Sequence, residues 1–318
     1  MLYSSLIFII FYYLYLLQPI TAIIIGGAVI PHGDFAYDPS LIHNANNSLL
    51  IHNASVALGE TLISLQPDII FLITPHGIAL TNDFAISLSS NGTGYATIGD
   101  DLHNASYPVY NVPMNFPLAP TLSTNLVNYL RNQHPNITGI LPWADSEGFP
   151  LRWGEIIPLT FLSSLINNSY TSTTPEVLIW SQPLRRYNDS VSMIPELLEI
   201  GDLLYNYFEN LSYRTLIIVS ADLAHTHLNP VQPYPPCECA TTFDNACTNW
   251  AITLNSSSLL IDAAAVVDDA LSCGYTGMVI LHGIISNRNP KFIPQLLAYA
   301  APTYYGMLVA SFLRSTAE

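Results

Sequence analysis

Apolar runs of strand length alternate with helix-like segments along almost the whole chain. Residues 23–30 (IIIGGAVI) and 68–74 (DIIFLIT) are continuous apolar runs rich in β-branched residues, which is typical of strands buried on both faces of a parallel sheet. Residues 55–65 (SVALGETLISL), between them, have the spacing of an amphipathic helix. This alternation favours an α/β fold with a mainly parallel central sheet flanked by helices.

The second half of the chain repeats the pattern. It predicts strands at 176–182, 214–221 and 305–312, and helices at 194–211 and 273–285. Thr241, followed three residues later by Asp244, resembles a capping box and predicts the start of another helix. No internal repeat or long linker interrupts the alternation. We therefore expect one domain over residues 23–318, long enough to bury a sizeable core.

The first 22 residues are expected to be a secretory signal peptide cut after Ala22. A long apolar stretch is followed there by a proline and small residues, which is the usual order in such peptides. Because a positively charged start is missing, a signal anchor left in the membrane is the alternative. No other run approaches the ~20 apolar residues of a spanning helix, so no membrane contact is expected after cleavage.

Nine N-x-[ST] sequons support a secreted, extracellular glycoprotein. Single matches arise by chance, but nine spread over the chain behind a signal peptide are a stronger signal. The candidate glycosylation sites are Asn46, Asn53, Asn91, Asn104, Asn136, Asn167, Asn188, Asn210 and Asn255.

The charge balance excludes some partners. The chain has a formal net charge of −15 and a single lysine, Lys291. Nucleic acids and anionic membrane surfaces bind clustered lysine and arginine, so neither is expected as a partner. A small molecule is compatible with this charge, and assembly into a homo-oligomer stays open.

Cys237, Cys239 and Cys247 lie close together in the sequence, whereas Cys273 stands apart. In an oxidising compartment the close group predicts one local disulfide, with Cys247 as one partner and a thiol left over. The alternative pairs Cys273 with one of the three. If Cys273 is free, a chemical role for its thiol is expected.

Three histidines directly follow predicted buried strands. His32, His76 and His225 come after the runs at 23–30, 68–74 and 214–221. Because the carboxyl ends of parallel strands share one edge of a sheet, these side chains are expected to converge. Neutral imidazole is a common metal ligand and general base, so the sequence predicts a metal-dependent or catalytic site there.

The other histidines have simpler interpretations. His227 could share the site with His225, and His282 is expected in the core. The remaining four are expected in solvated loops: His43, His52, His103 and His134.

Five segments carry a resemblance to a known superfamily. They are IPHGDFAYDP (30–39), PDIIFLITPHG (67–77), GEIIPLTFL (154–162), RTLIIVSADLAHTH (214–227) and CGYTGMVILHG (273–283). Their order and spacing resemble the superfamily that holds the B subunit of class III extradiol ring-cleavage dioxygenases and the Memo-like proteins. The chain is most similar to the AmmeMemoRadiSam branch, over residues 23–313.

This resemblance implies an Fe(II) site and assigns roles to residues. The dioxygenases bind ferrous iron through two histidines and a glutamate, and use another histidine as acid and base. The matching ligands here are His32 and His76, and the matching acid/base residue is His225. Cys273 stands at the place of the carboxylate ligand and resembles the Memo-like CG motif, which supplies a cysteine to a metal site. Asp222 is expected to orient His225.

The segment RWGEIIPL departs from the dioxygenase pattern D-H-G-x-x-x-P-L. Trp153 replaces a histidine thought to contact the substrate, and Arg152 replaces an aspartate. The carboxylate ligand is missing unless Glu155 reaches the metal. Two histidines and a thiolate suit copper or zinc better than iron.

Two main hypotheses follow. The first is a secreted dioxygenase that opens the ring of a small catecholic substrate with O₂, while His225 moves protons. The second is a non-catalytic or redox-protective copper-binding protein similar to Memo-like members, with copper on His32, His76 and Cys273. A zinc site with an open fourth position, and hence a hydrolase, is a third hypothesis.

Overall fold

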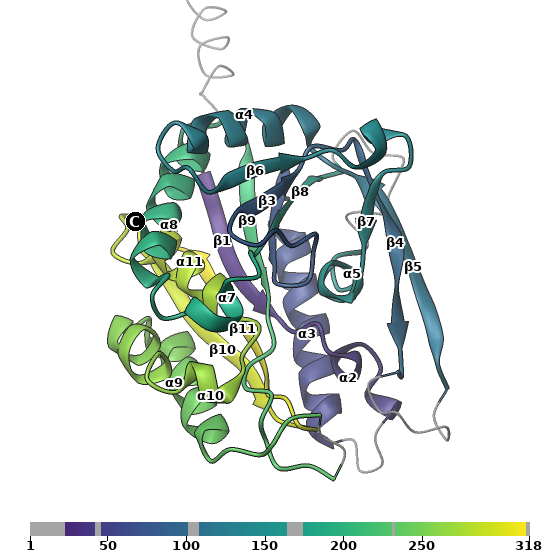
Figure 1. Cartoon of the computed structure of the whole chain (residues 1–318), viewed down its shortest axis with the longest axis vertical. Coiled ribbons are helices and arrows are strands. Elements are labelled where there is room, and N and C mark those ends of the chain that lie inside the picture. Colours follow the sequence, from purple (N-terminus) through teal and green to yellow (C-terminus); the bar gives the residue numbers. More distant parts are fainter. Residues whose placement is uncertain (1–22, 42–45, 101–107, 164–173, 231–232, 316–318) are drawn as a thin grey trace, which may run out of the picture.

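The computed structural model describes residues 23–41, 46–100, 108–163, 174–230 and 233–315 (Figure 1). The expected signal peptide (residues 1–22), two sequons (Asn104 and Asn167) and two histidines (His43 and His103) lie outside the described residues. No helix among the described residues is long and apolar enough to cross a membrane.

An eight-stranded sheet forms the centre of an α/β fold, as the sequence predicts. Its strand order is β10-β11-β1-β9-β2-β8-β3-β6. The strands are β1 (Ile23–Ile30), β2 (Ile69–Thr74), β3 (Phe84–Ser87), β6 (Ile137–Ile140), β8 (Glu176–Ser181), β9 (Arg214–Ser220), β10 (Phe292–Ala300) and β11 (Met307–Arg314).

The prediction of parallel strands holds for the centre of the sheet, and the sheet as a whole is mixed. The four central strands run parallel to one another, in the order β1, β9, β2 and β8. On one side β11 pairs antiparallel with β1 and with β10, and on the other β3 pairs antiparallel with β8. A short connection joins β10 to β11, and strands joined in this way pair as an antiparallel hairpin.

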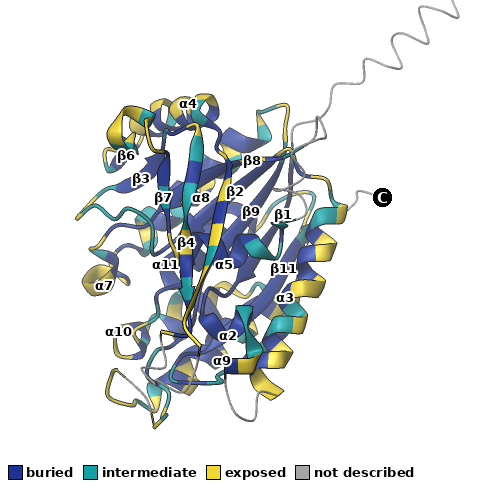
Figure 2. Cartoon of the chain, turned by 90° about the vertical axis from the view of Figure 1, so that its right-hand side faces the viewer, coloured by how far each residue is buried: buried dark blue, intermediate teal, exposed yellow. Residues whose placement is uncertain are grey.

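Helices cover both faces of this sheet, and two hydrophobic clusters fill the space between (Figures 1 and 2). Side chains alternate along β2: Phe71 packs with α8 and α11 on one face, and Ile70 and Leu72 pack with α3 and α5 on the other. The helices are α2 (Asp34–Tyr37), α3 (Asn46–Ser64), α4 (Pro120–Arg131), α5 (Trp153–Thr160), α7 (Arg186–Asp189), α8 (Ile194–Glu209), α9 (Cys239–Thr253), α10 (Val267–Ala270) and α11 (Tyr275–Ile285).

A second, three-stranded sheet stands beside α5, and the sequence patterns did not predict it (Figure 1). Its order is β5 (Tyr110–Pro117), β4 (Asn91–Ile98) and β7 (Phe149–Leu151). The strands β4 and β5 are rich in Gly, Asn and Pro, and they lack the continuous apolar runs of the central strands; β4 is partly buried and β5 is mostly exposed.

The predicted disulfide with Cys247 is wrong. Cys237 bonds to Cys239, and their Cα atoms lie 5.0 Å apart where the chain enters α9. Cys247 comes about two turns later on α9, where its side chain is fully buried in the core. Cys273 is free and buried, so the alternative that pairs it in a disulfide is also wrong.

Three smaller expectations also need correction. The helix α9 begins at Cys239 with no side-chain cap, and Asp244 is buried within it as a hydrogen-bond acceptor. His52 lies on α3 and bonds through Nδ1 to the carbonyl of Ala36 (2.9 Å). His134 follows the end of α4 and is buried, and its Nε2 lies 2.9 Å from the carboxylate of Glu196 on α8.

The seven sequon asparagines among the described residues are all accessible to some degree. Asn46, Asn53, Asn188, Asn210 and Asn255 are exposed, and Asn91 and Asn136 are half-buried. Glycosylation remains a prediction.

Glu196→Gln is expected to cost about 1–2 kcal/mol of unfolding free energy at pH 7, after allowance for solvent screening. Burial alone would raise the pKa of Glu196, but hydrogen bonds from His134, Arg185 and Asn136 outweigh it and lower the pKa to about 2. A depressed carboxyl pKa stabilises the fold above the unfolded value of 4.5, and this stabilisation is lost as the pH falls toward 2. The unfolding free energies of the wild type and Glu196→Gln are measured in urea at several pH values. If the variant loses as much unfolding free energy at pH 2 as at pH 7, the prediction is contradicted.

Candidate metal centre

His32, His76 and His225 lie at the same edge of the central sheet. They follow β1, β2 and β9, and β9 lies between the other two with all three strands parallel. The fourth residue, Cys273, precedes α11, and the amide of Gly274 next to it donates to the carbonyl of Asp222 (3.1 Å) just past the end of β9. Segments far apart in the sequence therefore meet at one place.

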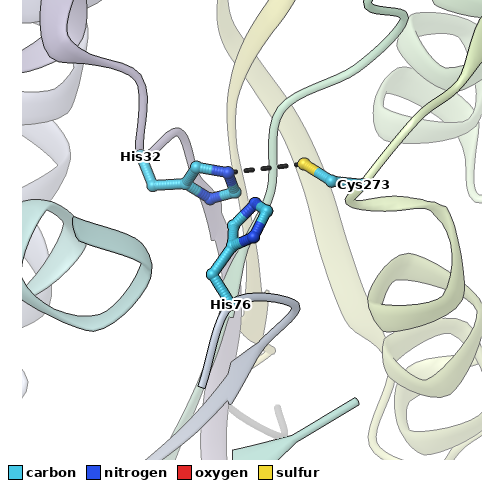
Figure 3. A group of neighbouring side chains, drawn as sticks. All are labelled: His32, His76 and Cys273. Carbon is cyan, nitrogen blue, oxygen red and sulfur yellow. Dashed lines mark hydrogen bonds between the residues drawn. The ribbon is translucent and has the colours of Figure 1, made fainter. Parts of the chain in front are cut away.

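His32, His76 and Cys273 form a compact group that could hold a metal ion (Figure 3). Their candidate ligand atoms all lie within 4.8 Å of one another. Sγ of Cys273 is 3.3 Å from Nε2 of His32, and the two imidazole rings meet edge to face with centroids 4.7 Å apart. His32 and Cys273 are buried, and His76 is partly exposed.

Hydrogen bonding fixes the tautomer of His32. The hydroxyl of Ser220 donates its single proton to the carbonyl of Gly154, so its oxygen accepts a proton from Nδ1 of His32 at 2.8 Å. With the proton on Nδ1, the lone pair of Nε2 faces Cys273. Such an outer hydrogen bond is the usual way to orient a histidine that binds a metal.

Burial keeps the group neutral when no metal is bound. Burial, with smaller effects of His76, His225 and Arg186, lowers the pKa of His32 well below its usual range. Burial and then Arg186 lower the pKa of His76 to about 3. Burial and the carboxylate of Asp222 raise the pKa of the Cys273 thiol to about 12. The imidazoles are thus ready to donate lone pairs, and metal binding at Cys273 must release a proton.

Glu155 does not join this group. It is fully buried, and its two oxygens accept hydrogen bonds from the hydroxyl of Thr74 (2.8 Å) and the amide of Arg152 (2.8 Å). Thr74 also accepts the amide of His76 (3.2 Å), so Glu155 positions the turn that carries this histidine. Burial outweighs these hydrogen bonds and raises the pKa of Glu155 to about 7.

A cavity of about 370 Å³ opens in front of the group. Its lining includes His32, His76 and His225, and the aromatic rings of Trp153, Tyr234, Tyr304 and Tyr305. The Trp153 ring lies 5.1 Å from the His76 ring, tilted by 38°. Aromatic walls with a few polar groups suit a small planar ligand.

His225 brings an unpaired nitrogen to this cavity. Among the described residues, Nε2 of His225 is buried without a hydrogen-bond partner. Its ring lies between Tyr234, Tyr304 and Tyr305, at centroid distances of 6.4, 6.2 and 5.8 Å. Burial, then Arg186 and His227, lower the pKa of His225 to about 4, so this imidazole is neutral at neutral pH.

Asp222 and His227 make contacts that the sequence did not indicate. The carboxylate of Asp222 accepts the backbone amide of His32 (3.2 Å) and lies 3.3 Å from Nε2 of the same residue. His227 turns toward α9, where its Nε2 lies 2.6 Å from Oδ2 of Asp244. His227 is not among the residues that line the 370 Å³ cavity.

Sequence reasoning missed Arg186. This buried arginine, at the start of α7, donates from Nη2 to the carbonyl of Pro75 (2.8 Å), next to His76. It lines a second cavity of about 180 Å³, which shares His76, His225 and Tyr234 with the larger one. Arg186 follows no strand end, and the one available signal was the pair Arg185–Arg186 in a chain with only eight lysines and arginines.

Ser220→Ala is expected to weaken metal binding by about 10-fold to 100-fold, the usual effect of losing such an outer hydrogen bond. Without the hydroxyl, nothing on this side holds the proton on Nδ1 of His32. A competition titration with a coloured chelator would measure the dissociation constant. Ser87→Ala, in the buried strand β3, is the matched control and should leave it unchanged. Equal affinities of the wild type and Ser220→Ala would contradict this role.

No protein-family model matches the sequence, and no curated protein is similar to it. Eighteen chains of known structure match the fold. One is the crystal structure of an uncharacterized protein, JW3007, from Escherichia coli K12. It has a TM-score of 0.54 and 16% sequence identity, over 91% of this chain and 99% of that one. At this identity the likeness concerns the fold alone.

Proposed function

We propose that this chain is a metal-dependent oxidoreductase of the extradiol catechol dioxygenase type, which opens a small catecholic ring with O₂. The observation that carries the proposal is the unpaired Nε2 of His225 in an aromatic-lined cavity beside His32, His76 and Cys273. The resemblance of five sequence segments to the class III extradiol and Memo-like superfamily points the same way.

The residues fit a metal ion. Nε2 of His32 is unprotonated, and the Cys273 sulfur and an imidazole nitrogen of His76 lie within 4.8 Å of it. Iron follows from the superfamily resemblance, whereas the thiol favours copper or zinc. A redox-capable metal bound here would supply the chemistry that joins O₂ to the substrate.

The chain's own residues would do the remaining work. Trp153 and Tyr305 line the cavity and would hold the aromatic ring by stacking. His225 would accept a proton from a catechol hydroxyl at Nε2 and return one during ring opening. Asp222 would hold His32 in place through its backbone amide.

A second function is favoured by one specific observation, the free and buried thiol of Cys273 at 3.3 Å from His32. Thiolates bind copper(I) strongly, so a copper-binding protein that limits adventitious oxidation is the alternative. A zinc hydrolase would use the same three ligands and keep the fourth position of the zinc open for water.

Metal loading and turnover together test the proposal. The purified protein is loaded separately with Fe(II), copper(I) and zinc, and catechol consumption and O₂ uptake are followed. We expect turnover with iron, its loss in His225→Gln with metal content retained, and unchanged turnover in the control His282→Gln, whose histidine lies away from both cavities. Tight copper binding without turnover in any metal form would favour the alternative.

We also propose that the protein is secreted and glycosylated. The apolar start of the chain, the sequons and the Cys237–Cys239 disulfide are compatible with a secreted glycoprotein. Treatment of the protein from a eukaryotic secretion host with an N-glycosidase should lower its mass, and an unchanged mass would argue against it.

A further inference from the structure

The Cys237–Cys239 disulfide is poorly suited to stabilising the whole fold. Its two cysteines are separated by one residue, and both are partly exposed. A disulfide restrains the unfolded chain mainly by closing a loop, and the restraint grows with the length of that loop. A loop with a single residue between its ends therefore contributes little to global stability. The bond is expected to act on the structure next to it.

That neighbouring structure includes the segment that carries His225. The amide of Cys237 donates to the carbonyl of Thr226 (2.9 Å), the residue after His225. The Thr226 hydroxyl also lies 3.9 Å from Sγ of Cys239, the first residue of α9. The disulfide therefore joins the start of α9 to a residue that is hydrogen-bonded beside His225.

Tyr234 links the disulfide to the candidate metal centre. It lines both the 370 Å³ and the 180 Å³ cavity, and its ring lies nearly parallel to that of His225, with centroids 6.4 Å apart and planes 26° apart. Only Pro235 and Pro236 separate it from Cys237. Proline fixes its own φ and restricts the residue before it, so this short connection is stiff. The position of the Tyr234 ring thus depends on how Cys237 is held.

The bond is open to chemical attack. Cys237 and Cys239 are partly exposed, whereas the free thiols of Cys247 and Cys273 are buried. The thiolate of a small thiol such as glutathione can attack one sulfur and form a mixed disulfide, and the other sulfur leaves as a thiolate that takes up a proton. A second thiolate then attacks the sulfur of the bound small thiol, so the cysteine is released as a thiol and the two small thiols leave as their disulfide. Exposed disulfides are the ones that undergo this exchange readily.

We propose that Cys237 and Cys239 form a redox site, which a small thiol reduces and which controls how closely Tyr234 covers His225. In the oxidised state the bond holds Cys237 against the start of α9, and the Tyr234 ring closes the wall that the two cavities share. In the reduced state Cys237 keeps its backbone hydrogen bonds but loses the covalent link, so the wall opens more often. This inference concerns access to the cavities and goes beyond the proposed reaction.

Equilibration of the native protein with glutathione buffers tests whether the bond is reducible. The cysteines are then alkylated without denaturant and counted by intact mass. We expect alkylation of Cys237 and Cys239 at millimolar reduced glutathione. The buried thiols of Cys247 and Cys273 are the internal control and should stay unmodified. A bond that is reduced only after the protein is unfolded in urea would overturn the redox site.

Modification of His225 by diethyl pyrocarbonate, located by peptide mass, tests the effect on access. This reagent attacks neutral imidazole, and Nε2 of His225 is buried and has no hydrogen-bond partner among the described residues. The double variant Cys237→Ser/Cys239→Ser should react about tenfold faster at His225 than the oxidised wild type, because its cavity wall opens more often. Cys247→Ser is the matched control and should react at the wild-type rate. His282, which lies away from both cavities, should keep its rate in all three proteins.

Equal rates at His225 in the wild type and the double variant would overturn the inference. An equal acceleration at His282 would show a general loosening of the fold and would also overturn it. If the double variant does not fold, the wild type alone provides the test: its reduction should accelerate hydrogen exchange at the amide of Cys237, and unchanged exchange would contradict the inference. None of these measurements uses turnover, so failure of the proposed reaction would leave their results unaffected.

Discussion

Replacing Cys273 by serine should lower the affinity of the protein for copper or zinc by on the order of 100-fold, at least as much as the loss of an outer hydrogen bond to a ligand. The Cys273 sulfur is the only soft donor in the group with His32 and His76, and a serine hydroxyl is a hard and weak ligand for both metals. Elemental analysis after dialysis, and chelator competition, measure the change.

Cys247→Ser is the matched control for this experiment. Cys247 is also free and fully buried, but it lies on α9 away from both cavities. Its replacement should leave the metal content unchanged, whatever it does to stability. If Cys273→Ser keeps its metal, and that metal is iron lost in His32→Ala, the thiol is not a ligand and the histidine-based dioxygenase remains.

Glu155→Gln should change the pH dependence of stability by about 3 kcal/mol between pH 4.5 and pH 7. In the folded protein burial raises the pKa of Glu155 from 4.5 to about 7. Between these values the folded state keeps a proton that the unfolded chain has lost. The wild type is therefore destabilised as the pH rises through this window, and the glutamine variant lacks this loss.

The measurement is the unfolding free energy of both proteins in urea at pH 4.5, 6 and 8. The buried histidines titrate in both, so the difference between the two proteins isolates Glu155. Glu196→Gln is the control, because the pKa of Glu196 is lowered and its contribution should be constant over the same range. A difference between Glu155→Gln and the wild type that does not change with pH would contradict the assignment.

The edge of the sheet at which the histidines lie could be predicted, because it depends only on which apolar runs form parallel strands. Continuous apolar runs identified β1, β2 and β9, and the residues after them had to lie at one edge. That β9 lies between β1 and β2 is a tertiary fact, and it is what brings His32, His76 and His225 within one site.

The features that the sequence did not reveal depend on side-chain contacts or on weak local patterns. The strands β4 and β5 contain Gly, Asn and Pro, which lower their β-propensity. Glu155 looked like a candidate ligand, and its two hydrogen bonds to Thr74 and Arg152 are contacts between segments that no spacing encodes. Arg186 was missed for the same reason, because its hydrogen bond to the carbonyl of Pro75 also joins two segments that no spacing encodes.

A metal ion bound at the candidate centre would also have a mechanical role, because His32 and Cys273 lie far apart along the chain. These two residues are 241 positions apart, and His76 comes from between them. A metal ion held by all three would act as a cross-link that closes loops covering most of the chain, and such cross-links reduce the entropy of the unfolded chain. The free energy of metal binding would then also be folding free energy, so the amount of available metal would decide how much of this protein survives heat or proteolysis.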